Sequence, residues 1–146
     1  MAQVRGNNAV SGTWGQFWWN DILIMEVQSF EAKIVPKRED VQIGYDIDSK
    51  INGIAGEGKF TLKHMYTRGA KYYLDAWKAG RDPRTTFVAK SGDPDTVRGQ
   101  EERVVIGNAW FNEMMLAQFE KGKTNEREYP FGFTASSASF YNTIEE

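Results

Sequence analysis

The 146-residue sequence predicts a mainly β protein, a small antiparallel β-sandwich or partly open barrel of about seven strands with one flanking α-helix at about residues 67–79. Most apolar residues alternate with polar ones, which is the pattern of strands that bury one face. Only one stretch has apolar residues at helical spacing. Gly, Pro, Asn and Asp residues separate the segments, as expected where antiparallel strands are joined by turns.

Length and composition favour one globular domain. We expect a single domain over residues 1–146, with a polar N-terminal arm over 1–13 and a C-terminal tail over 135–146. The sequence contains no cysteine, which excludes disulfides and thiolate metal sites. The formal net charge of −2 argues against nucleic-acid binding by bulk attraction, which needs clustered Lys and Arg. The N-terminus has no apolar core, so we expect no signal peptide, and no apolar run is long enough for a membrane span.

The first quarter of the chain predicts an aromatic strand followed by a long, irregular strand. Trp14–Trp19 is the aromatic strand, and Asn20–Asp21 forms a tight turn after it. The strand over residues 22–35 has its apolar residues first at odd and then at even positions. Either a bulge near Gln28–Ser29 inserts one residue, or the strand crosses from one sheet to the other there. Pro36 and the charged residues after it end the pairing, because proline cannot donate to a ladder.

A hairpin over Val41–Tyr66 organises the rest of the predicted fold. Two long antiparallel strands are joined at Ser49–Gly58, whose glycines indicate a flexible tip. The apolar positions of the two strands share one face: Val41, Ile43, Tyr45, Ile47, Phe60, Leu62 and Tyr66. The polar face carries opposite charges on the two strands, which pair across the ladder if the register brings them together: Asp46, Asp48, Lys59 and Lys63.

A single helix is predicted over Thr67–Ala79. Its apolar stripe has the spacing i, i+3, i+4 and i+7 and consists of Ala70, Tyr73, Leu74 and Trp77. Thr67 is positioned to cap the N-terminus through its hydroxyl. Gly80 suits the left-handed position after the last turn, and Pro83 prevents continuation of the helix. The stripe must dock on a sheet, because so short a helix does not persist alone in water.

The second half of the chain predicts further strands. Arg84–Lys90 is one strand, and Thr124–Thr134 is the last one. Residues 102–119 form one long strand or two, with the break either at Gly107 or at Asn112–Glu113.

Nothing in the sequence indicates catalytic residues, a metal site, a cofactor or a small-molecule ligand, so we do not expect an enzyme. His64 is the only histidine, and no further ligands are spaced to converge on it. The glycines of residues 53–58 superficially resemble a phosphate-binding loop, but they precede a strand and not a helix. Carboxylate pairs such as Asp46 and Asp48 are interpreted as the solvated side of a strand.

An ordered set of short motifs along nearly the whole chain points to a family. The motifs are Asn8…Ser11-Gly12, Phe30-Glu31-Ala32, the charged turn before Val41, Gly53…Gly56-x-Gly58, Gly80-x-Asp82-Pro83, Arg103-Val104 and Pro130-Phe131-x-Phe133. In these the chain resembles the tail tube protein of contractile-tailed phages and of phage-like particles of Gram-positive bacteria. It departs from the family in the aromatic run Trp14–Trp19 and in the C-terminal tail.

The resemblance implies a structural role. Family members form hexameric rings that stack into a hollow tube, and strands from neighbouring subunits join around the lumen. Contraction of a surrounding sheath drives the tube through the cell envelope, where the lumen conducts DNA or the tube perforates the membrane. The implied partners are other copies of the chain, the tail sheath protein, and the baseplate and tail-terminator proteins. DNA is expected to pass without sequence-specific binding. The implied location is the virion tail or a phage-like particle, assembled in the cytoplasm of the bacterial host.

Within that role the hairpin supplies candidate site residues. We expect its polar face to line the lumen through Gln42, Asp46, Asp48, Lys59, Thr61 and Lys63. We expect its glycine-rich middle and the two terminal arms to contact the neighbouring ring, with the loop candidates Ser49, Lys50, Asn52, Gly53, Gly56 and Glu57. The alternative function is a monomeric β-sandwich module that binds carbohydrate on the aromatic surface Trp14–Trp19. An enzyme with a sandwich fold is a third alternative.

Overall fold

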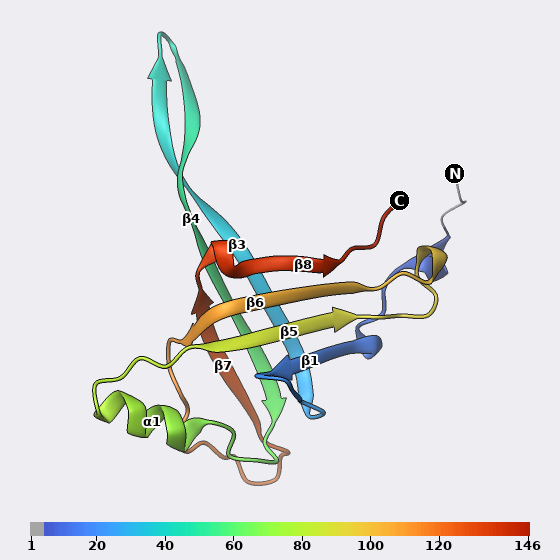
Figure 1. Ribbon diagram of the computed structural model, residues 1–146, viewed down its shortest axis with the longest axis vertical. Helices are drawn as coiled ribbons and strands as arrows, with labels where there is room; N and C mark the ends of the chain where they lie inside the picture. The colour runs from blue at the N-terminus through green and yellow to red at the C-terminus, as the bar shows by residue number, and fades with distance from the viewer. Residues whose placement is uncertain (1–4) are drawn as a thin grey trace.

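The computed structural model describes residues 5–146, so the first four residues of the expected N-terminal arm lie outside the described part. It contains one eight-stranded sheet, one α-helix and four short 3-10 helices (Figure 1). The strands are β1 (Gly15–Trp19), β2 (Ile22–Leu23), β3 (Val27–Ile43), β4 (Asp46–Lys63), β5 (Thr85–Ser91), β6 (Glu102–Phe111), β7 (Glu126–Phe133) and β8 (Ala138–Asn142). The helix is α1 (Ala70–Lys78).

The sheet bends so that two layers of antiparallel strands face each other. The strand order is β2-β1-β5-β6-β7-β4-β3, and β8 pairs separately with β6. β6 joins the layers, because Arg103–Ile106 pair with β8 whereas Ala109–Phe111 pair with β7. Figure 1 shows β1, β5, β6 and β8 crossing β3, β4 and β7 at a steep angle, with α1 beside one end. The predicted mainly β, partly open sandwich with one flanking helix is confirmed.

The core between the layers is aromatic. Its buried rings are Phe17, Trp19, Phe60, Tyr73, Phe87, Phe111, Tyr129, Phe131 and Phe133. Phe60 stacks on Tyr129 with ring centroids 4.9 Å apart, and it meets Phe17 of the opposite layer at 4.7 Å. Such aromatic pairs contribute about 0.5–1.5 kcal/mol each beyond their buried area. The predicted aromatic strand is therefore confirmed as β1, and its Phe17 and Trp19 rings pack inward.

The hairpin is much longer than predicted, and its turn lies elsewhere. Ile43 pairs with Asp46, so the turn is Gly44–Tyr45, and Gly44 has φ 60°. Glycine with positive φ at the first central position is what a type II′ hairpin turn requires. The prediction of a loop at Ser49–Gly58 is wrong. These residues belong to β4 and pair with residues 32–40 of β3.

The glycines of β4 allow close packing of aromatic side chains. A Cβ atom on Gly56 would lie 2.4 Å from the ring of Phe133, and one on Gly58 would lie 2.7 Å from the ring of Phe131. Both rings come from β7, which pairs with β4 at these positions. The glycines were interpreted as signs of a flexible tip, but the structure uses them where another group approaches the backbone.

Pro36 does not end the strand, contrary to the prediction. It lies inside β3 opposite Ile54. β3 is the last strand in the sheet order, so its outer edge has no strand partner among residues 5–146. A proline whose missing N–H faces that edge removes no ladder hydrogen bond. The bulge predicted near Gln28–Ser29 is confirmed by a register shift between Val27 and Ser29.

Helix α1 starts later than predicted. Gly69 is its N-cap residue, with φ 68°, so Thr67 does not cap the helix. Ala70 and Tyr73 of the predicted stripe are buried, whereas Trp77 is 37% exposed. The predicted left-handed glycine after the last turn is confirmed, since Gly80 has φ 78°.

The C-terminal third differs from the prediction in two places. The segment 102–119, predicted as one long strand or two, contains only β6, because residues 112–125 contain no strand. The expected tail over 135–146 is partly regular, because it contains β8, whose residues pair with Arg103–Ile106 of β6. Its polar and small residues gave no alternation by which β8 could be predicted. The strand predicted over Thr124–Thr134 is confirmed as β7, but it is not the last strand, because β8 follows it.

Candidate functional site

One face of β3, β4 and β7 is polar and solvent-accessible. Register places Glu31, Lys59 and Pro130 side by side across the three strands, and it places Lys33, Glu57 and Gly132 in the next row. The opposite face of the same strands is core. We call the polar side the charged face and define it by Glu31, Lys33, Glu57, Lys59, Thr61, Lys63, Glu126 and Glu128.

The charged face is close to electrically neutral. Its four Glu and three Lys residues are interspersed along the strands. Lys33 and Glu57 form an ion pair with 3.7 Å between the charged atoms, and Lys63 and Glu126 form another at 3.4 Å. Exposed pairs of this kind add little stability, at most about 1 kcal/mol each. Their consequence is a surface without a strong field of either sign.

The expected ion pairs across the hairpin are not formed. Asp46 and Asp48 belong to the same strand as Lys59 and Lys63, so they cannot pair with them across a ladder. Lys59 lies opposite Glu31, and Asp48 lies opposite Val41. The prediction failed because it placed the turn inside β4. Residues of this one strand were therefore assigned to two different strands.

Five of the six lumen candidates nevertheless share one side of the ladder. Asn52 and Gly53 together lie opposite Lys37, a bulge in which Gly53 has φ 126°. One extra residue shifts the alternation, so even-numbered residues before the bulge share a side with odd-numbered ones after it. Those on the charged side are Asp46, Asp48, Lys59, Thr61 and Lys63. Gln42 is the exception, because it pairs with Ile47 on the other side.

The distal half of the hairpin projects beyond the two layers. Figure 1 shows the ends of β3 and β4 extending away from the remaining strands. Every residue from Lys33 to Ala55 is exposed. The six ring-contact candidates all lie in β4, the first four of them in this distal half: Ser49, Lys50, Asn52, Gly53, Gly56 and Glu57. They form a strand with a bulge, whereas the sequence predicted a loop. Gly56 is buried under Phe133 and is not available for contact.

The projecting half also exposes large apolar side chains. These residues are Ile34, Val35, Val41, Ile43, Tyr45, Ile47, Ile51 and Ile54. Because the turn is at Gly44–Tyr45, Val41 shares a side with Asp48, and Ile47 shares a side with Gln42. The predicted separation into an apolar and a polar face is therefore wrong in the distal half, although Phe60 and Leu62 do face the core. Apolar surface of this extent marks an interaction site.

Both terminal arms dock on the segment that follows β5. The backbone N–H of Ser11 donates to the buried carboxylate of Asp93 at 2.9 Å, and Asn8 donates to the carbonyl of Asp95 at 2.9 Å. On the other arm, Gln100 exchanges two hydrogen bonds with the backbone of Glu145. The described part of the N-terminal arm and the end of the chain are thus held by residues 93–100.

A buried ion pair connects the segment before β3 with the segment before α1. Glu26 is 6% exposed and accepts two hydrogen bonds from Arg68, the second from Nη2 at 3.2 Å. Burial opposes ionisation of Glu26, but the hydrogen bonds and the charge of Arg68 outweigh it and lower the pKa of that carboxyl. No local sequence pattern predicts this pair, because its partners are 42 residues apart.

The aromatic run does not form a binding platform. Phe17 and Trp19 are 1% and 8% exposed and belong to the core, and only Trp14 of the run is half-exposed. A carbohydrate platform needs several exposed rings side by side, so the alternative function loses the surface on which it was based.

The described residues offer no constellation for metal chemistry. Among residues 5–146, no three His, Cys, Asp or Glu side chains gather where they could hold a metal ion. His64 is exposed, and its backbone N–H donates to the carbonyl of Asn125. In the same range, no helix has the length and apolar character needed to cross a membrane.

Comparison with known sequences identifies one family. The model of the family described as phage tail tube protein matches residues 2–137. Two relatives come from Bacillus subtilis (strain 168): the phage-like element PBSX protein XkdM and the uncharacterized protein YqbM. Each is 26% identical over 133 residues, which covers 89% of this chain and 90% of the relative.

Comparison with solved structures shows similar folds at low sequence identity. The tube-terminating cap of the anti-feeding prophage has a TM-score of 0.71 at 7% identity, covering 97% of both chains. A chain of the sheath–tube complex of the extracellular contractile injection system PVC has a TM-score of 0.69 at 6% identity, covering 92% of this chain and 93% of that one. The anti-feeding prophage baseplate contains a chain with a TM-score of 0.57 at 6% identity, covering 86% and 89%.

Proposed function

Since the chain belongs to the phage tail tube protein family, and is therefore a tail tube subunit, we propose that its copies close into hexameric rings that stack into a hollow tube. The observation that carries this proposal is the unpaired outer edge of β3. This strand has 17 residues, and its outer edge meets no other strand within residues 5–146. An edge of that length invites pairing with another chain. Closure of several copies into one barrel pairs every such edge.

Ring closure through β3 makes the charged face the wall of the lumen. β3, β4 and β7 then form each subunit's share of the barrel, with the aromatic core and α1 outside it. The near-neutral charge of this face suits the passage of DNA, because tight binding of a duplex needs Lys and Arg to neutralise phosphates. The lumen residues of this proposal are those of the charged face: Glu31, Lys33, Glu57, Lys59, Thr61, Lys63, Glu126 and Glu128. Asp46 and Asp48 lie on the same side of the ladder but in the projecting half of the hairpin.

The same proposal includes the surrounding tail. Solved structures with this fold come from a sheath–tube complex, a tube-terminating cap and a baseplate. We therefore propose that this tube is enclosed by a contractile sheath and contacts baseplate and terminator proteins at its ends. Its task is mechanical: the tube is driven through the cell envelope and conducts DNA or perforates the membrane. Assembly takes place in the bacterial cytoplasm. The subunit needs neither a cofactor nor an enzymatic activity for this role.

Electron microscopy of the purified protein tests the assembly directly. Negative-stain images at increasing protein concentration are expected to show rings and hollow tubes. A protein that stays a compact monomer at every concentration, in size-exclusion chromatography and in images, contradicts the proposal.

A cysteine-labelling experiment tests which face lines the lumen. The sequence contains no cysteine, so a single Lys59→Cys substitution gives a unique label site. A bulky polymer-linked maleimide is expected to react with the dissociated subunit but not with the assembled tube. Equal reaction in both states would place the charged face on the outside of the tube.

A further inference from the structure

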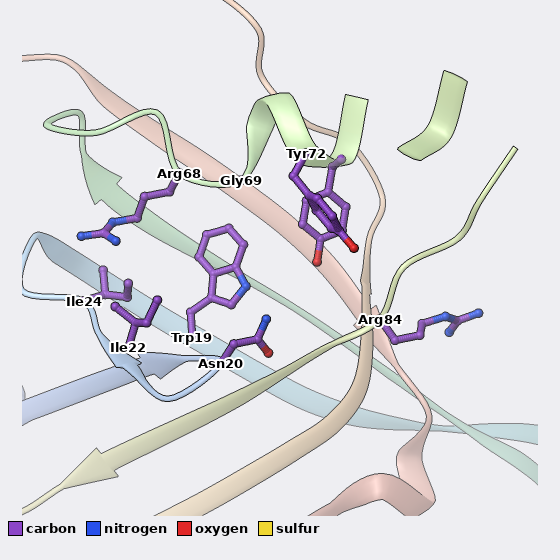
Figure 2. Close-up of a pocket in the computed structure, with 9 residues that line it drawn as sticks. Trp19, Asn20, Ile22, Ile24, Arg68, Gly69, Tyr72 and Arg84 are labelled. Atoms are coloured by element: carbon purple, nitrogen blue, oxygen red, sulfur yellow. The ribbon is translucent and has the colours of Figure 1, made fainter. Parts of the chain in front are cut away.

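A pocket of about 330 Å³ opens between the β1–β2 turn and the start of α1. We call it the Trp19 pocket and define it by Trp19, Ile22, Ile24, Arg68, Tyr72 and Tyr73. Figure 2 shows the Trp19 ring between Ile22, Ile24 and Arg68 on one side and Tyr72 on the other. Ile22 and Tyr72 are more than half exposed, although both are apolar or aromatic. The pocket thus combines a rigid apolar floor with a cation at its rim.

The cation at the rim is fixed in place. Arg68 donates two hydrogen bonds to the buried carboxylate of Glu26. A guanidinium has five N–H donors, so others remain for a further acceptor. The side chain of Arg68 is 22% exposed and lies where such an acceptor can reach it.

The hairpin tip has the complementary chemistry. Tyr45 is the most exposed large hydrophobic side chain of the described residues, at 104% relative exposure, and Ile43 and Ile47 flank it at 62% and 72%. Asp46 and Asp48 follow on the same strand. A fully exposed aromatic ring on a tight turn, with carboxylates beside it, is suited to enter a pocket with an apolar floor and a basic rim.

The charges of the two regions are opposite over a wider range. Residues 39–49 contain four acidic residues and no basic one: Glu39, Asp40, Asp46 and Asp48. Residues 64–84 contain five basic residues and two acidic ones, and two of the basic residues, Arg68 and Arg84, line the pocket: Arg68, Lys71, Lys78, Arg81 and Arg84 against Asp75 and Asp82. Complementary charge of this kind sets the orientation of association and accelerates it.

The two regions lie at opposite ends of the molecule. In Figure 1 the tip of the β3–β4 hairpin is at one end of the long axis, and α1 with the β1–β2 turn is at the other. The tip cannot reach its own pocket. A contact between one end of a molecule and the other end of the next copy is heterologous, and its repetition builds a stack.

We propose that the hairpin tip of each copy docks into the Trp19 pocket of a copy in the adjacent ring. The Tyr45 ring fills the pocket over Trp19, and the carboxylates of Asp46 and Asp48 face Arg68 and its basic surroundings. This inference rests on the proposed stacking of rings, and it identifies the partner surface of the hairpin. It assigns the apolar tip, the pocket and the separated charges to one interface.

Crosslinking between introduced cysteines tests the contact. In the cysteine-free background, the double variant Tyr45→Cys/Tyr72→Cys is assembled and treated with a short bis-maleimide. We expect a ladder of covalent multimers that extends beyond the hexamer, whereas a mixture of the two single variants gives only dimers. The matched control is Tyr45→Cys/Tyr141→Cys, because Tyr141 is also exposed but lies on β8; we expect no ladder. A ladder that stops at the hexamer, or a ladder in the control alone, overturns the proposal.

A substitution at the tip tests its importance for stacking. Tyr45→Ser leaves the fold unchanged, because the side chain touches nothing in its own subunit, and circular dichroism with urea unfolding verifies this. We expect rings but at least tenfold fewer tubes, whereas the control Tyr141→Ser assembles like the unsubstituted protein. If Tyr45→Ser forms tubes normally, the docking inference fails and the tube proposal stands. If the unsubstituted protein forms neither rings nor tubes, the tube proposal itself fails.

Discussion

At the scale of single residues, the ion pair between Glu26 and Arg68 connects two segments of the chain that meet near the start of α1. Glu26 lies just before β3, and its carbonyl accepts from the N–H of Lys63 at the end of β4. Arg68 lies just before α1. The pair therefore connects the base of the hairpin with the entry to the helix, and removal of one partner leaves the other charge in a largely buried site.

We expect Glu26→Gln to lower the free energy of unfolding by about 2 kcal/mol at pH 7, since Arg68 loses a charged acceptor. The pKa of Glu26 is lowered in the folded state from an ordinary value of 4.5. Its contribution is thus complete above that value and is lost as pH falls through the folded pKa. Urea unfolding at pH 7 and at successively lower pH measures this.

The ion pair is tested by comparing the free energy of unfolding of the unsubstituted protein with that of Glu26→Gln at each pH. The difference between the unsubstituted protein and Glu26→Gln is expected to shrink as the solution is acidified below pH 4.5. A difference that stays constant over this range would show that the carboxylate's charge contributes nothing.

Gly58 tests the role of close packing on β4. A Cβ atom there would lie 2.3 Å from the carbonyl oxygen of Glu31 and 2.7 Å from the Phe131 ring. Gly58→Ala is therefore expected to destabilise the fold by about 2 kcal/mol through overpacking. The control is Gly6→Ala, whose added Cβ would meet nothing within 4 Å. Thermal unfolding of both variants gives the answer, and equal stability would refute the packing role of Gly58.

At the scale of elements, the hairpin β3–β4 is where the sequence was most informative and also most misleading. Alternation identified Phe60 and Leu62 as inward-facing and Lys59 as outward-facing, and burial confirms this. The turn was misplaced because several glycines lie at 53–58, whereas Gly44 is the only glycine at the actual turn. A glycine in a sequence marks either a special backbone angle or a close neighbour, and only the neighbour's position tells these apart.

The strand β3 also shows that a local sequence pattern does not determine where a strand lies in the sheet. Pro36 forbids a central strand, yet it is compatible with an edge strand. Whether a strand is at the edge depends on the order of the whole sheet, which local pattern does not contain. The bulge at Gly53 is likewise a property of two paired strands and was not visible in either one alone.

Shortening the hairpin tests whether its distal half serves only assembly. Residues 38–51 are replaced by Asn-Gly, a pair that forms two-residue hairpin turns. All the removed residues are exposed, so the body of the subunit should keep its free energy of unfolding. We expect a folded protein that forms rings but no tubes, as observed by circular dichroism and electron microscopy. Normal tubes from this variant would exclude the hairpin from ring stacking, and an unfolded variant would show that the distal half supports the body.

At the scale of the whole molecule, the fold class and the flanking helix could be predicted because alternation and helical spacing are local properties. The strand order and the docking of both arms on residues 93–100 could not, since they depend on contacts such as Ser11 with Asp93. The same holds for the surfaces. The charged face is assembled from β3, β4 and β7, and only their register reveals that Lys59 lies between Glu31 and Pro130.

The features of the molecule agree with one role. It has a long edge that no strand within residues 5–146 pairs with, a near-neutral polar face, and opposite charge and shape at its two ends. An isolated subunit leaves all three without a use, whereas a tube of stacked rings uses each of them.

The separation of charge also makes assembly sensitive to ionic strength, because salt screens exposed charges over about 10 Å at 0.1 M.

A cryo-electron microscopy map of the assembled tube tests the central claim most directly, because it shows which residues line the lumen. We expect hexameric rings in which Glu57, Lys59 and Lys63 face the channel, β3 pairs with a strand of the neighbouring subunit, and the hairpin reaches the adjacent ring. A map in which Glu57, Lys59 and Lys63 lie on the outer wall, or in which β3 remains unpaired, would contradict the account.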